Sequence, residues 1–141
     1  MICGRLVGEA VVDVEVDLAG GLPLFSTVGL PDAAVKESKD RIKAAIKNSG
    51  FNFPQKKITV NLAPAYIKKE GSAFDLPMAI AILTASGEIP KETPLKYIFV
   101  GELSLDGGLK AINGVLPMAV AARDEGFTGI ILAVENAEEA A

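Results

Sequence analysis

Histidine and tryptophan are absent from this sequence of 141 residues, and cysteine occurs once. Without histidine, neither a Ser-His-Asp triad nor a Cys-His pair can form within the chain. A zinc site, which usually takes its ligands from histidine and cysteine, is disfavoured for the same reason. A single cysteine excludes an internal disulfide bond, which fits a protein of the reducing cytoplasm.

Long apolar runs and nucleotide-binding motifs are also missing. No apolar run approaches the ~20 residues of a membrane span, and the N-terminus does not resemble a signal peptide. Neither G-x-x-x-x-G-K-[ST] nor G-x-G-x-x-G occurs. The net charge of −4 argues against a dedicated nucleic-acid-binding domain. We therefore expect a cytoplasmic chain with no membrane contact and no cofactor, nucleotide or metal site of its own.

Half of the residues are hydrophobic, which is enough for the core of a single domain over residues 1–141. Residues 10–18 alternate valine or leucine with acidic residues, the pattern of a strand with one wet face. Asp13, Glu15 and Asp17 would lie on that face. A metal site is an alternative reading, but a solvated sheet face explains the alternation better. Residues 24–28 are predicted to return as the second strand of a hairpin.

A helix is predicted to start in residues 29–32 and to run to about Ser49, with Gly50 ending it. Its apolar stripe would consist of Val35, Ile42, Ala45 and Ile46. Lysines 36, 39, 43 and 47 form a row on another face, which suggests contacts to a phosphate backbone. Glu37 and Asp40 interleave with that row at helical spacing, so a solvated face with ion pairs is the preferred interpretation.

The stretch 70–83 runs from a polar, glycine-bearing loop into an apolar helix, around which we expect the chain to be organised. Asp75 is predicted to be the N-cap, with Pro77 in the first turn, where its missing N–H is harmless. A start with Ser72 and Asp75 as a capping box is the alternative. Because the helix N-terminus can stabilise an oxyanion, a serine here could be a nucleophile. A core helix with an ordinary polar loop is the simpler interpretation.

Further strands are predicted at 58–62, 97–101, 103–105 and 109–112, with a last buried strand in 127–134. A second proline-led helix is expected from 116 to about 125, and another helix begins near 135. The fold class predicted from this order is α+β, a mixed sheet of five or six strands with helices on one face.

Four stretches together, residues 28–38, 60–65, 69–79 and 101–107, resemble the ComM/YifB proteins, which are magnesium-chelatase-like AAA+ ATPases. The resemblance extends over essentially the whole chain. It implies that residues 1–141 are the N-terminal, Lon-like domain of a longer protein whose AAA+ motor holds ATP and Mg. The implied partners are that motor domain, other copies in a homo-hexamer, and DNA. The implied role is branch migration in natural transformation.

The resemblance also implies a fold shared with the second domain of a small-subunit ribosomal protein, GHMP kinases and the Lon peptidase domain. Lon peptidases use a serine and a lysine as base. Superposing the motifs places these positions on Ala73 and Leu116, neither of which can exchange a proton. Ser72 lies one position off, and Lys110 lies six residues early. We therefore predict no catalytic residue in this chain.

Three alternatives remain open. The first is a divergent peptidase that uses Ser72. The second is a nucleic-acid-binding module that uses the lysines of 36–47, 56–57 and 68–69. The third is a magnesium-chelatase subunit acting in tetrapyrrole synthesis.

Overall fold

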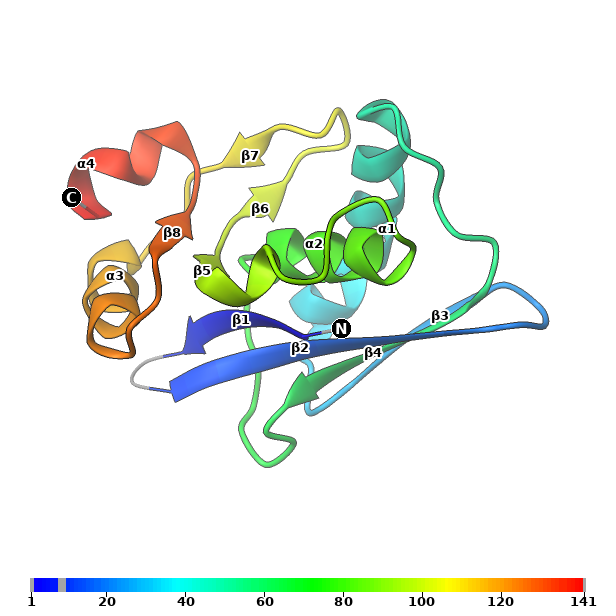
Figure 1. Ribbon diagram of the computed structural model, residues 1–141, viewed down its shortest axis with the longest axis horizontal. Helices are drawn as coiled ribbons and strands as arrows, with labels where there is room; N and C mark the ends of the chain where they lie inside the picture. The colour runs from blue at the N-terminus through cyan, green and yellow to red at the C-terminus, as the bar shows by residue number, and fades with distance from the viewer. Residues whose placement is uncertain (1, 8–9, 141) are drawn as a thin grey trace.

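A mixed six-stranded sheet in the order β3-β4-β2-β1-β5-β8 forms the centre of the molecule (Figure 1). The computed structural model describes residues 2–7 and 10–140. The strands are β1 (Ile2–Val7), β2 (Ala10–Ala19), β3 (Leu24–Val28), β4 (Lys57–Ala63), β5 (Tyr97–Phe99) and β8 (Gly129–Ile131). A separate two-stranded hairpin pairs β6 (Glu102–Leu103) with β7 (Leu109–Lys110). The predicted mixed α+β class is confirmed.

The middle of the sheet follows the predicted alternation. Val12, Val14 and Val16 of β2 are buried in the main core, as are the apolar residues at alternate positions of β4. Successive side chains of a strand point to opposite faces, so the acidic residues of β2 lie on the other face. There Asp13 is exposed, but its carboxyl is partly shielded from solvent, and this desolvation together with the nearby Glu15 carboxylate raises the pKa of Asp13.

The predicted hairpin between residues 10–18 and 24–28 is wrong. β3 pairs in parallel with β4, and β4 is antiparallel to β2, so β4 lies between the two strands that are adjacent in sequence. Local pattern predicts each strand but not its neighbour. β4 pairs on both of its edges, and its Ile58, Val60 and Leu62 are buried on the face that turns to the core.

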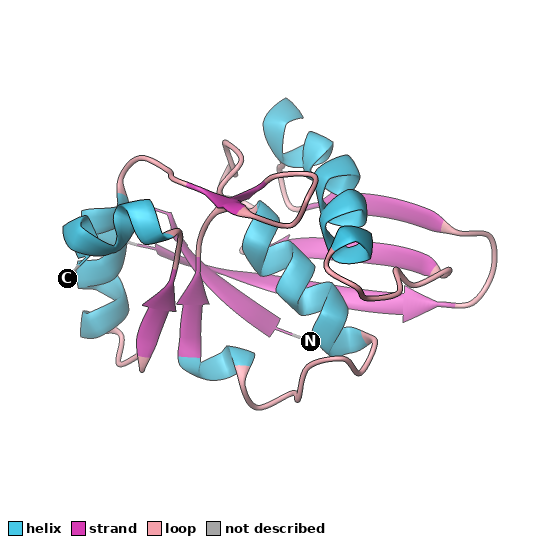
Figure 2. Ribbon diagram, turned by 90° about the horizontal axis from the view of Figure 1, so that it is seen from above, coloured by secondary structure: helices cyan, strands magenta, loops and turns pink. Residues whose placement is uncertain are grey.

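Two helices cover one face of the sheet: α1 (Ala33–Asn48) and α2 (Asp75–Ala85) (Figure 2). The expectation that all helices share that face is corrected by α3 (Val115–Asp124). Ile98 packs with Met118 of α3, whereas its neighbour Phe99 belongs to the main core under α2. Because neighbouring side chains of a strand face opposite ways, α3 covers the reverse side of β5.

The ends of the chain differ most from expectation. β1 was not predicted, because its sequence ICGRLV shows no alternation; it forms by pairing with β2 and β5. β8 was predicted to be buried, but it is an edge strand and Ile131 is 40% exposed. A short 3-10 turn (Val134–Asn136) and α4 (Ala137–Ala140) follow. In the described ranges, no helix combines the length and apolar character needed to cross a membrane.

Candidate functional site at the start of helix α2

Helix α2 begins at Asp75, and Pro77 lies in its first turn as predicted. The predicted N-cap role of Asp75 is wrong, as is the capping box with Ser72. Phe74 occupies the N-cap position, and no side chain caps the helix. The physical reason is that the Asp75 carboxylate is fully buried and turned toward α1, away from its own first turn.

The Asp75 carboxylate joins three elements through four hydrogen bonds. The Ser38 hydroxyl donates to Oδ1 at 2.5 Å. Arg41 donates from Nε to Oδ2 at 2.6 Å and from Nη2 to Oδ1 at 3.0 Å. The backbone N–H of Leu103, in β6, donates to Oδ2 at 3.0 Å. Charge-assisted bonds of this bidentate kind are the stronger class of protein hydrogen bonds, so Asp75 fastens α1 and the β6–β7 hairpin to α2.

Arg41 supports the same junction from the surface side. Its hydrogen bond to Asp75 raises the pKa of the guanidinium further above its ordinary value. The Arg41 side chain is 22% exposed and also donates to the backbone carbonyl of Ala34. The junction is therefore a buried carboxylate held by a partly exposed cation, a structural arrangement that leaves no carboxylate oxygen unpaired.

The backbone N–H groups that could stabilise an oxyanion are engaged as well. Asp75 N–H donates to the carbonyl of Ser72 at 3.1 Å, and Leu76 N–H donates to the carbonyl of Gly101 at 3.1 Å. Pro77 has no N–H. A helix N-terminus binds an anion through unsatisfied N–H groups, and the first three residues of α2 offer none.

The two positions aligned with a peptidase dyad lie in different surroundings. Ala73 is 8% exposed, and its carbonyl accepts from Gly101 N–H at 3.1 Å. Leu116, on α3, is half exposed. Of the substitutes considered, Ser72 is half-buried, and the Lys110 ammonium lies 3.8 Å from Glu102 across the β6–β7 hairpin. Within the described ranges, no hydrogen bond joins Ser72 to a lysine.

Lys69 is fully buried, which is rare for a lysine. Its ammonium donates to the carbonyl of Pro64. The backbone N–H of Lys69 donates to the carbonyl of Leu30, and the carbonyl of Lys69 accepts from Asp32 N–H, at 2.9 Å each. Burial lowers the pKa of Lys69. Its proposed contact with nucleic acid, one of the sequence alternatives, is therefore corrected: the ammonium fastens the loop before α2 and does not reach solvent.

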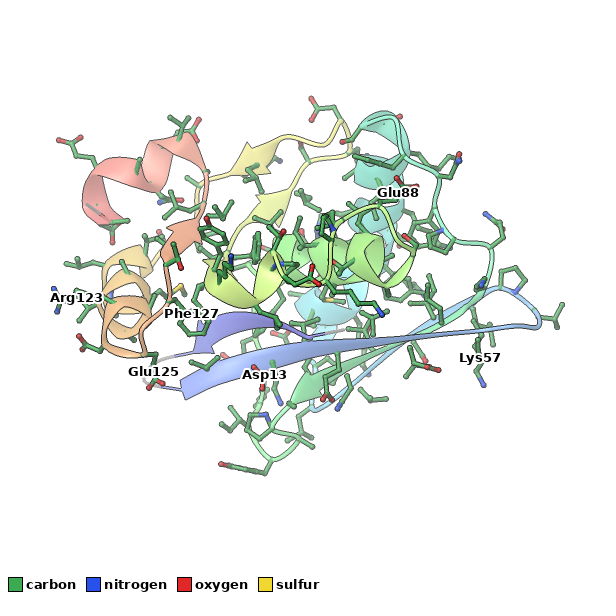
Figure 3. The ribbon with its side chains drawn as sticks, in the orientation of Figure 1. Asp13, Lys57, Glu88, Arg123, Glu125 and Phe127 are labelled. Carbon is green, nitrogen blue, oxygen red and sulfur yellow. The ribbon has the colours of Figure 1, made fainter. Side chains whose placement is uncertain are left out.

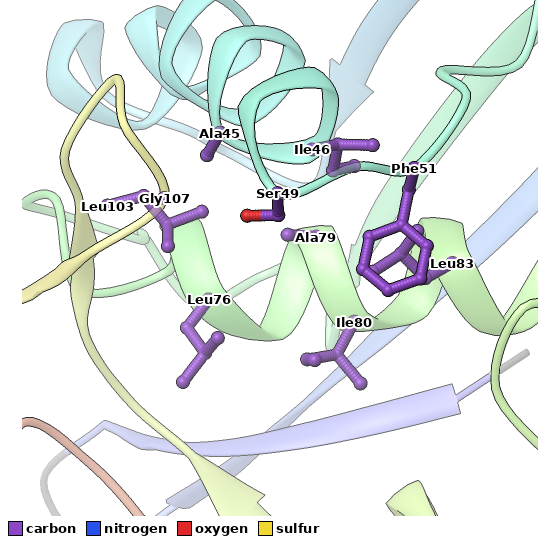
Figure 4. Close-up of a pocket in the computed structure, with 10 residues that line it drawn as sticks. All are labelled: Ala45, Ile46, Ser49, Phe51, Leu76, Ala79, Ile80, Leu83, Leu103 and Gly107. Carbon is purple, nitrogen blue, oxygen red and sulfur yellow. The ribbon is translucent and has the colours of Figure 1, made fainter.

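Ten residues line a small apolar hollow between the end of α1, α2 and the hairpin (Figure 4). Its volume is about 140 Å³, and Phe51 lies at its rim beside Ile80 and Leu83 of α2. Ser49 supplies a hydroxyl there, and none of the described residues that line the hollow is charged. Such a lining suits apolar contact and holds no general acid or base.

The α1 lysine row is exposed as predicted, but its predicted ion pairs are not formed. Glu37 lies 3.9 Å from Arg41, and no carboxylate of the described residues lies within ion-pair distance of lysines 36, 39, 43 or 47. The lysines are therefore available to an outside partner. Lys68, in the loop before α2, is exposed and lies 3.5 Å from Glu70.

Sequence reasoning missed the roles of Asp75 and Lys69. A charged residue at a helix start is more often a cap than a buried anchor, and lysine is almost never fully buried. One feature of the sequence indicates a buried partner for Asp75. Ser38 and Arg41 lie beside the apolar stripe of the predicted helix, and polar side chains that are buried there need hydrogen-bond partners.

Comparison with known proteins adds a family. The profile of the family described as subunit ChlI of Mg-chelatase matches residues 14–136. The protein YifB of Salmonella typhimurium is 47% identical over 91% of this chain and 25% of its own length. The competence protein ComM of Haemophilus influenzae is 46% identical over 95% of this chain and 26% of its own. Lon protease 2 of Bacillus subtilis is 30% identical over 72% of this chain and 18% of its own. The chain thus spans about a quarter of the length of the first two relatives.

Proposed function

Because the chain belongs to the ComM/YifB family, with a region that matches subunit ChlI of Mg-chelatase, we propose that it is a non-catalytic domain of a longer magnesium-chelatase-like AAA+ ATPase. In this proposal the ATP and Mg site lies in a motor domain of the same protein, which assembles as a hexamer and acts on DNA. Branch migration during natural transformation is the proposed role.

The observation that carries the non-catalytic part is the chemistry of two side chains. By the superposition of motifs on Lon peptidases, Ala73 and Leu116 take the positions of the serine and the lysine, and a methyl or isobutyl group cannot attack a carbonyl or accept a proton. The engaged N–H groups of Asp75 and Leu76 support the proposal, because an oxyanion would have no donor there. The Lon similarity then reflects a shared scaffold.

A peptidase assay tests this part. The 141-residue chain and its Ser72→Ala variant are incubated with unfolded casein, and we expect no cleavage that depends on Ser72. Serine-dependent cleavage would overturn the proposal and favour a divergent peptidase. As a second readout, isothermal titration with ATP should show no tight binding to this chain.

The proposed role on DNA is tested with the full-length protein. Deleting the segment that corresponds to this chain should leave ATP binding by the motor intact and impair hexamer assembly or strand exchange on branched DNA. An intact rate of strand exchange after the deletion would contradict the proposed role.

The family description favours a second candidate, a chelatase subunit in tetrapyrrole synthesis. ATP-dependent insertion of Mg²⁺ into protoporphyrin by the full-length protein with partner subunits would support it. Branch migration without chelatase activity would support the first proposal.

A further inference from the structure

Positive charge is concentrated in one part of the chain. Residues 41–69 hold seven of the 14 lysine and arginine residues and not one of the 18 acidic residues. The net charge of the chain is −4, so the remainder is strongly acidic. Two of the seven serve the fold, since Arg41 holds Asp75 and Lys69 is buried. The question is where the others point.

Three lysines surround the loop between α1 and β4, residues 49–56. Lys43 and Lys47 project from the last two turns of α1, and Lys56 ends the loop; all three are exposed. Lys43 lies 5.7 Å from the centre of the Phe53 ring. Lys57 differs: it points to the opposite side of the sheet (Figure 3), as expected next to the inward-facing Ile58.

Three hollows of the surface meet at this loop. One of about 510 Å³ is lined by Lys47 and Asn52, and one of about 390 Å³ by Asn52 and Lys56. A third, of about 50 Å³, is lined by Lys43 and Lys56. Phe53 and Gln55 line all three. Among the described residues, Glu88 is the only acidic one that lines any of these three hollows.

The loop also presents an aromatic ring and two amides. Phe51 is 39% exposed and lines both the largest of these hollows and the apolar hollow beside α2 (Figure 4). Phe53 is stacked on Phe25, with 6.3 Å between the ring centres, and so anchors the loop to β3. Asn52 and Gln55 are exposed and offer both donors and acceptors.

We propose that this loop, with Lys43, Lys47 and Lys56, binds single-stranded nucleic acid: the lysines contact phosphates, and a base stacks on Phe51. A basic groove with an accessible aromatic ring is the combination that single-stranded nucleic acid requires. An acidic peptide would match the charge of the lysines. It would offer neither a base face to stack on the Phe51 ring nor base edges to form hydrogen bonds with the amides. A duplex hides its base faces. The inference rests on the proposed role on DNA and assigns the contact to this domain.

The test is fluorescence anisotropy of a labelled oligothymidine of about 12 nucleotides with the 141-residue chain. Binding should weaken with salt, with a log–log slope of about −2 if three phosphates are neutralised at about −0.7 each. Replacing Lys43, Lys47 and Lys56 together by Gln should weaken binding at low salt by about tenfold or more, and should bring the slope of affinity against salt close to zero.

Two further variants separate charge from stacking and position. Lys57→Gln is the matched control, because it removes the same charge next to Lys56 on the other side of the sheet; its affinity should stay within about twofold. Phe51→Leu keeps apolar packing without the ring, so affinity should fall about tenfold at an unchanged salt slope. Thermal melts verify that each variant is folded.

Several outcomes would overturn the inference. Flat anisotropy at the lowest salt would do so, as would a loss of affinity in Lys57→Gln as large as the loss in the triple variant of Lys43, Lys47 and Lys56. Tighter binding of polyglutamate would identify an acidic protein segment as the partner, and equal binding of a duplex would remove the single-strand assignment. If this loop is not the binding site but the proposed function holds, DNA still changes the ATPase rate of the full-length protein. If DNA does not change that rate either, the proposed function is wrong.

Discussion

Asp75→Ala is the substitution that the structure makes most informative. It removes a fully buried carboxylate that accepts hydrogen bonds from Ser38, Arg41 and the backbone of Leu103. The helix itself should tolerate alanine well. Any large loss of stability therefore reports on the junction between α1, α2 and the hairpin, and not on helix propensity.

The size of the loss follows from what remains after the change. A buried donor left without an acceptor costs about 1–3 kcal/mol, and both the Leu103 N–H and the buried Ser38 hydroxyl lose theirs. Arg41 contributes less, because its side chain is 22% exposed and keeps its bond to Ala34. We expect the free energy of unfolding to fall by about 3–5 kcal/mol, as when one partner of a buried pair is removed. Asp75→Asn keeps the volume and one acceptor oxygen, so it should cost about 1–3 kcal/mol.

Urea unfolding followed by circular dichroism suits the measurement, because the chain has no tryptophan. Asp40→Ala, an acidic residue on the exposed side of α1, is the matched control and should change stability by less than about 0.5 kcal/mol. A loss below about 1 kcal/mol for Asp75→Ala, or equal losses for the alanine and asparagine variants, would refute the reasoning.

Three other predictions concern the fold. Gly29→Ala should cost about 2–5 kcal/mol, because a Cβ there would lie 2.2 Å from a carbonyl oxygen of β4 at a φ of +103°; Gly20→Ala, with open space around it, is the control in the same melts. Since burial lowers the pKa of Lys69, the unfolded chain binds a proton that the folded chain does not over the alkaline range just below the ordinary lysine pKa. Stability should rise with pH across that range and not in Lys69→Met; parallel curves in urea titrations at several pH values would contradict this. Ile82→Ala, at a fully buried site, should cost about 2–5 kcal/mol, and Ile80→Ala, which is half-buried, clearly less; similar losses would contradict the placement of α2.

The elements predicted well are those that local sequence determines. α1 is capped by Asp32, whose carboxylate accepts from Val35 N–H at 2.8 Å, and Gly50 follows it at a φ of +91°. The strand at 10–18 followed from the alternation of its residues, and the buried character of α2 followed from its almost continuous apolar sequence. Each of these depends on contacts within a few residues.

The parts that sequence could not predict depend on pairing between distant segments. Packing between apolar faces that are distant in sequence determines two such features. One is the insertion of β4 between β2 and β3, and the other is the position of α3 on the reverse face of β5. At the site, the start of α2 was predictable to within one residue. The partners of Asp75 were not, because they lie 28 to 37 residues away in sequence.

The start of α2 indicates how packing can engage the groups that a catalytic site would need. A catalytic helix start needs unpaired N–H groups and a side chain with a proton to exchange, and both requirements reduce stability, because unpaired buried groups are costly. Here Asp75 N–H and Leu76 N–H are bonded to backbone carbonyls, and the Asp75 carboxylate is saturated. The same groups cannot serve packing and a reaction at once. If this region is devoted to holding α1, α2 and the hairpin together, the function of the domain depends on its surface. The exposed lysines around residues 49–56 are one part of that surface, and no ion pair among the described residues engages them.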